Sequence, residues 1–182
     1  MAPAAEQGYP VDRLLDSNNV ECFVVPSYGG VVGVTATGQP EFTARVAVTS
    51  AQLLALHTTP IQLTYIAPVP LYPAVANNNW IIIPKSISLH YLYATAAYTT
   101  TGGTMRVSYG PVANAVYACA DQSAILGGTA NAVLANIAIS TIASQTDAVG
   151  LAQNLYLVNP GTNFTVGGGS LVVGITYNIM TL

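Results

Sequence analysis

The side chains that most often carry catalysis or bind metal ions are few in this chain and far apart. The two histidines, His57 and His90, have no Cys, His, Asp or Glu at metal-ligand spacing. His57 follows a short predicted helix, a position from which an imidazole caps the last carbonyls. His90 falls on the polar side of a predicted strand. Both positions favour a structural role over a catalytic or metal-binding one.

Two carboxylates beyond the N-terminal region, Asp121 and Asp147, are the candidates for a paired acid and base. Glycosidases use such a pair, with the two carboxyl groups roughly 5–10 Å apart. Both residues stand in turn-like surroundings, within Ala-Asp-Gln-Ser and Gln-Thr-Asp-Ala. Asp in this setting accepts hydrogen bonds from neighbouring backbone N–H groups. The pattern therefore favours turn capping, and we predict no catalytic residue.

Motifs that bind cofactors or nucleotides are also missing from the sequence. It contains no serine nucleophile elbow, P-loop or dinucleotide-binding glycine pattern, and the glycines of residues 29–33 indicate only a turn. Residues 163–165 match a glycosylation acceptor, but the first residues do not resemble a secretory signal. Cys22 and Cys119 are too few for a disulfide framework, and separate burial is favoured over pairing. We expect neither a cofactor nor a metal site.

Charge is scarce. The chain has 182 residues with 4 Lys or Arg and 7 Asp or Glu, so that 6% are charged, where an ordinary soluble domain has roughly 25%. So few basic side chains form no stripe for phosphates, and direct nucleic-acid binding is not expected. The apolar runs are far shorter than the roughly 20 residues of a membrane-spanning helix. The surface is therefore either coated with neutral polar groups or largely covered by other subunits.

The charges divide the chain at residue 41. Residues 1–41 hold five carboxylates against Arg13, a net charge of −4, whereas residues 42–182 hold two carboxylates against three basic residues, a net charge of +1. The first segment is also rich in Pro and Gly, which interrupt regular structure. We expect an extended arm over 1–41, with one or two short strands such as residues 21–25. The alternative is a frayed terminus.

Beyond residue 41, apolar residues recur at every second position, the period of a half-buried strand. This alternation predicts strands over residues 42–49, 61–66, 86–93, 105–109 and 171–180, separated by turns rich in Gly and Pro. The clearest helix covers residues 50–56, with Thr49 or Ser50 as its N-cap. Residues 129–149 fit either a helix or short strands. Many short strands and hardly any helix indicate an all-β antiparallel sandwich or barrel.

Tyrosine is the main aromatic residue of the chain, with eleven copies. Five tyrosines are in phase with core-facing strand residues and are expected in the core: Tyr65, Tyr91, Tyr93, Tyr109 and Tyr177. Four fall in the arm or in loops: Tyr9, Tyr28, Tyr72 and Tyr98. Tyrosine offers a large apolar area and one hydrogen bond, which interface cores favour. The Pro-rich loop that holds Tyr72 also suits a sugar-binding platform, as an alternative.

Several motifs follow one another in a fixed order, at residues 49–63, 81–89, 97–107, 109–110, 154–159 and 163–171, with a closing strand after them. This order over residues 43–182 resembles that of small virion proteins of tailed bacteriophages. Those proteins form jelly-roll-like sandwiches that decorate the head or belong to fibres and tails. The loop before Ile81 differs from the family's Gly-rich charged loop, because it is longer and rich in Pro and Asn.

The resemblance implies a jelly-roll-like β-sandwich over residues 42–182, with one short helix and an extended N-terminal arm, and no enzymatic activity. It implies a capsid decoration (cement) protein that binds the major capsid lattice as a homotrimer. Such a protein is made in the bacterial cytoplasm and lies on the outer capsid surface of the virion. The alternatives are a tail, baseplate or fibre component and, from another class, a carbohydrate-binding β-sandwich module. The candidate interface residues are Tyr9, Asp12, Arg13, Asp16, Glu21, Tyr28, Tyr72, Trp80 and Tyr98.

Overall fold

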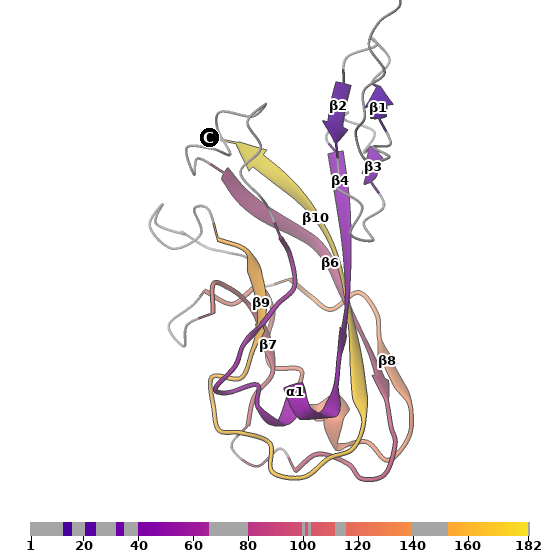
Figure 1. Ribbon diagram of the computed structural model, residues 1–182, viewed down its shortest axis with the longest axis vertical. Coiled ribbons are helices and arrows are strands. Elements are labelled where there is room, and N and C mark those ends of the chain that lie inside the picture. The colour runs from indigo at the N-terminus through magenta and orange to yellow at the C-terminus, as the bar shows by residue number, and fades with distance from the viewer. Residues whose placement is uncertain are drawn as a thin grey trace, which may run out of the picture.

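The computed structural model describes residues 13–15, 21–24, 32–34, 40–65, 80–99, 101, 103–111, 116–139 and 153–181, and strands dominate this part of the chain (Figure 1). The strands are β1 (Arg13–Leu15), β2 (Glu21–Val24), β3 (Val32–Val34), β4 (Pro40–Val48), β5 (Ile61–Gln62), β6 (Trp80–Leu92), β7 (Arg106–Tyr109), β8 (Ala132–Leu134), β9 (Leu155–Val158) and β10 (Ser170–Thr181). The helices are α1 (Ser50–Leu54) and the short 3-10 helix η1 (Ser123–Gly127).

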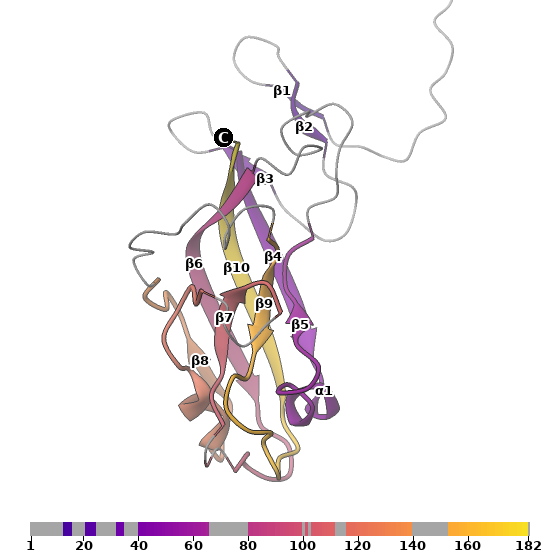
Figure 2. The same ribbon diagram turned by 90° about the vertical axis from the view of Figure 1, so that its left-hand side faces the viewer.

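Two antiparallel sheets make up the body of the molecule. One has five strands in the order β3-β4-β10-β6-β8, and the other has three strands in the order β5-β9-β7. The three-stranded sheet lies in front of the five-stranded one in Figure 2. β1 and β2 pair with each other in a small sheet of their own. The predicted all-β antiparallel sandwich is confirmed.

The strand connections are those of a jelly roll. After β7, the chain extends the three-stranded sheet through a bridge between Ser108 and Tyr117, so the Tyr117 segment takes the place of a further strand. We number eight segments along the chain, from β4 as the first to β10 as the eighth, with the Tyr117 segment as the fifth. The larger sheet then holds β4, β10, β6 and β8, which are segments 1, 8, 3 and 6. The smaller sheet holds β5, β9, β7 and the Tyr117 segment, which are segments 2, 7, 4 and 5. Eight segments in two interlocked Greek keys define the jelly roll.

The apolar alternation of the sequence decides which face of each strand is buried. In β10, Leu171, Val173 and Ile175 are buried, while the residues between them are only partly covered. In β4, Phe42 and Val48 are buried, and the positions between the apolar residues are exposed. Because β10 lies between β4 and β6, the last strand of the described chain forms the middle of the sheet.

Strand β6 changes its buried face at a β-bulge. Consecutive residues of β10 pair with Ser86 and Pro84, so that Lys85 has no partner in β10. One extra residue in a strand shifts its alternation by one position. Pro84 is tolerated here because a bulge needs no ladder hydrogen bond from its nitrogen. The buried residues are accordingly even-numbered before the bulge (Trp80, Ile82, Pro84) and odd-numbered after it (Ile87, Leu89, Tyr91).

A similar irregularity overturns the core prediction for Tyr65, whose side chain is 78% exposed. The backbone N–H groups of Leu63 and Thr64 both donate to the carbonyl of Leu155, at 2.8 and 3.4 Å. Both of these side chains are buried, so the alternation predicted from the sequence slips by one residue at this point. Of the other predicted core tyrosines, Tyr91, Tyr109 and Tyr177 are buried and Tyr93 is half-buried.

The predicted helix is confirmed as α1, with Thr49 as its N-cap. Thr49 and Gln52 form a capping box, in which the Gln52 backbone N–H donates to Thr49 Oγ1 at 3.3 Å and the Thr49 N–H donates to Gln52 Oε1 at 2.9 Å. A helix of one and a half turns is not stable alone. Leu53 and Leu56, both fully buried, hold it against the core. In the ambiguous segment 129–149, the described part contains a strand, β8.

Candidate assembly surface

The outer face of the five-stranded sheet carries mainly small, neutral side chains on four neighbouring strands. Strand pairing aligns them in rows that run across β4, β10 and β6, and the first row continues onto β8. The rows are Val133, His90, Val172 and Ala47; Ser88, Gly174 and Arg45; and Ser86, Thr176 and Thr43. Together with Lys85, we call these residues the outer sheet face.

The outer sheet face is open to solvent. Val133, on the edge strand β8, is 63% exposed, and Thr43, Ala47 and Ser88 are exposed as well. An antiparallel sheet with one face on the core normally covers its other face with polar and charged residues. Here Val172 and Ala47 lie side by side on this face, and Val133 adds a further apolar side chain at its edge.

The face is also flat at its centre. A Cβ atom added to Gly174 would lie 2.6 Å from Ser88 Oγ, so the serine side chain occupies the space above the glycine. Two sheets pack face to face at about 10 Å when the side chains between them are of ordinary size. The small side chains beside Gly174 therefore let a partner approach the sheet closely at this point, between the longer side chains of Arg45, His90 and Lys85.

Two cations lie on this face, Arg45 and Lys85. Both side chains are exposed. Lys85 points to the solvent side of the sheet, since its neighbour Pro84 is buried on the core side. Among the side chains that the structure describes, the carboxylates are those of Glu41 and Asp121, and neither forms an ion pair with these cations. The described carboxylates thus leave the positive charges of the face uncompensated.

Two residues predicted to lie at an interface need correction, because their own chain already covers them. Trp80 is 4% exposed and Tyr98 is 3% exposed. The Tyr98 hydroxyl donates to the carbonyl of Gly169 at 2.6 Å, and its ring contacts Tyr91 and Phe164 edge-on. Although Tyr98 is in a loop as predicted, that loop folds over the end of the core.

The remaining predicted interface residues belong to the arm or to a loop. Arg13 and Glu21 lie in β1 and β2, for which the structure describes the backbone only. Tyr9, Asp12, Asp16, Tyr28 and Tyr72 lie outside the described residues. Sequence reasoning missed the outer sheet face itself. Its signal was the run of neutral residues at the solvent-facing positions of the predicted strands.

Asp121 has the turn-capping role that the sequence predicts. One carboxylate oxygen, Oδ1, accepts hydrogen bonds from the backbone N–H groups of Met105 at 2.7 Å and Ser123 at 2.9 Å. The other oxygen accepts from the Ser123 hydroxyl at 2.9 Å. The carboxylate therefore joins the start of η1 to the residue before β7. Asp147, its potential partner in a catalytic pair, lies outside the described residues.

The histidines do not form a site with other ligands. His57 Nδ1 lies 2.9 Å from the carbonyl oxygen of Asn159, so the ring contacts the loop after β9. The prediction that His57 caps the last carbonyls of α1 is therefore wrong. Backbone N–H groups already take up carbonyls at that end, including those of Ala51 and Leu53. Within the described part of the chain, no group of three or more His, Cys, Asp and Glu residues is placed to hold a metal ion.

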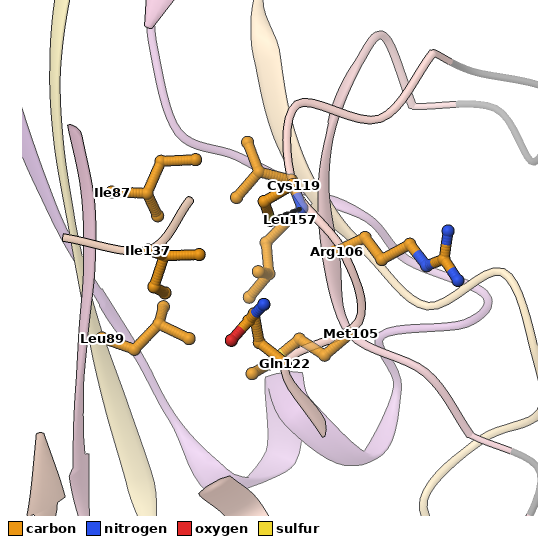
Figure 3. Close-up of a pocket in the computed structure, with 9 residues that line it drawn as sticks. Ile87, Leu89, Met105, Arg106, Cys119, Gln122, Ile137 and Leu157 are labelled. Carbon is orange, nitrogen blue, oxygen red and sulfur yellow. Dashed lines mark hydrogen bonds between the residues drawn. The ribbon is translucent and has the colours of Figure 1, made fainter. Parts of the chain in front are cut away.

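A crevice between the two sheets is apolar and closed. Ile87 and Leu89 of β6 face Leu157 of β9 across it, and the guanidinium group of Arg106 points away from it (Figure 3). The crevice has no room for a water-sized molecule. It is a packing gap of the core and not a ligand site.

Cys119, which lines this crevice, is a buried free thiol. Its sulfur accepts a hydrogen bond from the backbone N–H of Val107 at 3.4 Å. Burial raises the pKa of the Cys119 thiol, which keeps it protonated and unreactive. The separate burial predicted from the sequence is thus confirmed for Cys119, whereas the side chain of Cys22 lies outside the described residues.

Aromatic residues gather on the outer face of the three-stranded sheet. Strand pairing places Tyr156 and Tyr117 on either side of Ser108. The Arg106 guanidinium lies 4.7 Å from the centre of the Tyr117 ring, and the Tyr156 hydroxyl donates to Gln62 Oε1 at 3.3 Å. Ser108, between the two rings, is fully buried.

Among the described residues, no helix is both long and apolar enough to cross a membrane. No family model matches the chain, and no curated protein matches it. The fold is similar to a chain of the cyanophage Pam1 capsid asymmetric unit, with a TM-score of 0.39 and 15% identity over 90% of this chain and 96% of that one. It is also similar to a chain of the cucumber necrosis virus crystal structure, with a TM-score of 0.28 and 14% identity over 98% of this chain. The chain spans 61% of the cucumber necrosis virus chain. Both likenesses are distant.

Proposed function

We propose that this chain is a structural protein of a tailed-bacteriophage virion, which binds the major capsid lattice as a homotrimer and stabilises the head. The observation that carries the proposal is the outer sheet face, an open surface on which most side chains are small and neutral. The resemblance of residues 43–182 to small virion proteins supports the same assignment. Asp121 is occupied by structural hydrogen bonds, and the crevice in the core is closed, so neither supports an enzymatic reading.

The charge density of the whole surface also supports an assembly role. The chain exposes 10515 Å², and its 4 basic and 7 acidic residues amount to 11 charges, about one per 960 Å². A soluble surface with roughly 30% charged residues would carry about one charge per 200 Å². Contacts between subunits remove neutral surface from water and so raise the density of charge on the surface that stays exposed. An assembly with closed symmetry does this without leaving an unpaired contact surface on any subunit.

A protein that binds only the assembled lattice stabilises that lattice by mass action. The gain per site is RT ln(1 + [L]/Kd), about 2.7 kcal/mol when the free protein is at a hundred times its Kd. Repeated over many sites, increments of this size oppose the loss of capsid subunits under internal DNA pressure. Decoration therefore requires no reaction chemistry.

The test compares virions that carry the protein with virions from which its gene has been deleted. We expect the deleted particles to assemble but to release DNA at lower temperature, and added protein to restore their stability. Val172→Lys, in the middle of the outer sheet face, should restore it poorly, whereas Thr165→Lys, an exposed position elsewhere, should act like the wild-type chain. Unchanged DNA release after deletion would overturn the proposal.

Electron microscopy of virions with labelled protein separates the alternatives. Label distributed over the head supports decoration. Label confined to the tail would identify a tail, baseplate or fibre component and refute the head assignment. Binding of the purified protein to a glycan array, without any binding to particles, would identify a carbohydrate-binding module instead.

A further inference from the structure

The outer sheet face holds an uncompensated pair of cations, Arg45 and Lys85, and their separation follows from the register. Arg45 shares a row with Ser88, two strands away, and Lys85 precedes Ser88 by three positions in β6. With strands about 4.8 Å apart and about 3.3 Å per residue, the two backbone positions lie about 14 Å apart. An acidic partner must match this spacing.

The arm of the same chain offers carboxylates at a matching distance. Asp12 and Asp16 directly precede and follow β1, which the structure describes as extended. Four residues of extended chain span about 13 Å. The segment up to residue 41 has a net charge of −4, and the rest of the chain has a net charge of +1. Arm and sheet face are therefore complementary in both sign and spacing.

Within the described part of the chain, neither cation of the outer sheet face has an acidic partner. Arg45 and Lys85 are both exposed, without an ion pair to a described carboxylate. β1 pairs with β2 in a sheet of its own. An arm from a second copy is the occupant that has the required charge and is present wherever the protein assembles.

We propose that the acidic arm of one copy docks on the outer sheet face of a neighbouring copy, with the carboxylates of Asp12 and Asp16 beside Arg45 and Lys85. The inference deepens the proposed function and rests on its self-association. Exposed ion pairs are individually weak and are screened by salt, since the Debye length falls from about 10 Å at 0.1 M to about 3 Å at 1 M. Two ion pairs at a fixed spacing stabilise the same contact together, and this contact determines which copies exchange arms.

The experiment is a charge-swap complementation on the full-length chain, followed by sedimentation velocity at 0.05 M and 1 M salt. The variant Arg45→Glu/Lys85→Glu has an acidic face and an acidic arm, and Asp12→Lys/Asp16→Lys has a basic face and a basic arm. We expect each variant alone to associate at least tenfold more weakly than wild type at low salt. An equimolar mixture should regain association, because each arm then finds a face of opposite charge.

Control measurements distinguish the possible failures. Ala51→Glu/Thr165→Glu adds charge at exposed positions away from the face and should associate like wild type. Because both cations are exposed, Trp80 fluorescence should show unchanged folding in the face variant. Variants that form the same oligomer as wild type would refute the arm contact and leave the assembly role standing. A wild-type chain that stays monomeric and does not bind capsids would refute the proposed function itself.

Limited trypsin digestion adds a second readout, because Arg13 is the single tryptic site in residues 1–41. Docking should slow cleavage after Arg13 several-fold, and the protection should grow with protein concentration and disappear in 1 M salt. Protection that is independent of concentration would mean that the arm binds its own chain, and it would overturn the proposal.

Discussion

Replacing Asp121 by Ala should lower the free energy of unfolding by about 2–4 kcal/mol. The substitution removes three hydrogen bonds to the carboxylate, two of which come from the backbone N–H groups of Met105 and Ser123, both buried residues. A buried donor left without an acceptor costs about 1–3 kcal/mol, and the remaining bonds add about 1 kcal/mol. Asp121→Asn keeps one acceptor oxygen but loses the charge, so we expect a loss of about 1–2 kcal/mol.

Urea unfolding followed by the fluorescence of Trp80, the one tryptophan of the chain, measures both variants. Trp80 is buried, so its emission reports the loss of the core. Thr58→Ala is a suitable control, because Thr58 is an exposed residue whose hydroxyl donates to the nearby carbonyl of Ala55 at 3.0 Å, and it should change stability by less than about 0.5 kcal/mol. If Asp121→Ala unfolds at the wild-type urea concentration, the carboxylate does not hold the two segments together, and the capping interpretation is refuted.

Three further predictions follow from buried groups. Burial raises the pKa of Tyr109 and of three other tyrosines, Tyr91, Tyr98 and Tyr177. The unfolded chain therefore loses these protons first, and the stability that the buried phenols contribute, which is complete below about pH 10, should be lost as the pH rises above it; a free energy of unfolding that stays the same between pH 9 and pH 12 would contradict this. Gly169→Ala should lower the free energy of unfolding by about 1–3 kcal/mol, since a Cβ there would lie 2.4 Å from a Tyr91 ring carbon and 2.7 Å from the Leu92 carbonyl oxygen. Thermal melts measure this loss, and a wild-type midpoint would contradict the prediction. In a Cys22→Ser background, Cys119 should react with a thiol reagent only as fast as the chain unfolds, and rapid labelling of the native protein would show that it is accessible.

The sequence predicted the strands best where one face is buried without interruption. Residues 42–48 and 171–177 alternate as expected, because the apolar side chains of each strand face the core. The prediction failed at Tyr65, where two successive residues share one carbonyl of β9. Such irregularities depend on the partner strand, which no local pattern reveals. The jelly-roll connection was implied only by the resemblance, since alternation does not specify which strands pair.

The candidate surface was only partly within reach of the sequence. Trp80 and Tyr98 were expected at an interface, because an aromatic ring with few charged neighbours suits a core as well as a contact between subunits. The small residues of the outer sheet face have no chemical signature of their own. Ala47 and Val172 become neighbours only when β4 and β10 are aligned, and a flat surface exists only after that register is formed.

The position of β10 determines when the protein can fold. Residues 170–181 form the middle of the five-stranded sheet, yet they pair with residues 78 to 137 positions earlier in the chain. A growing polypeptide therefore holds β4 and β6 without their common neighbour until these residues have left the ribosome. A chain that breaks off before that point lacks a centre for the sheet and presents two open strand edges, which chaperones and proteases recognise. Only copies synthesised through β10 can complete the five-stranded sheet.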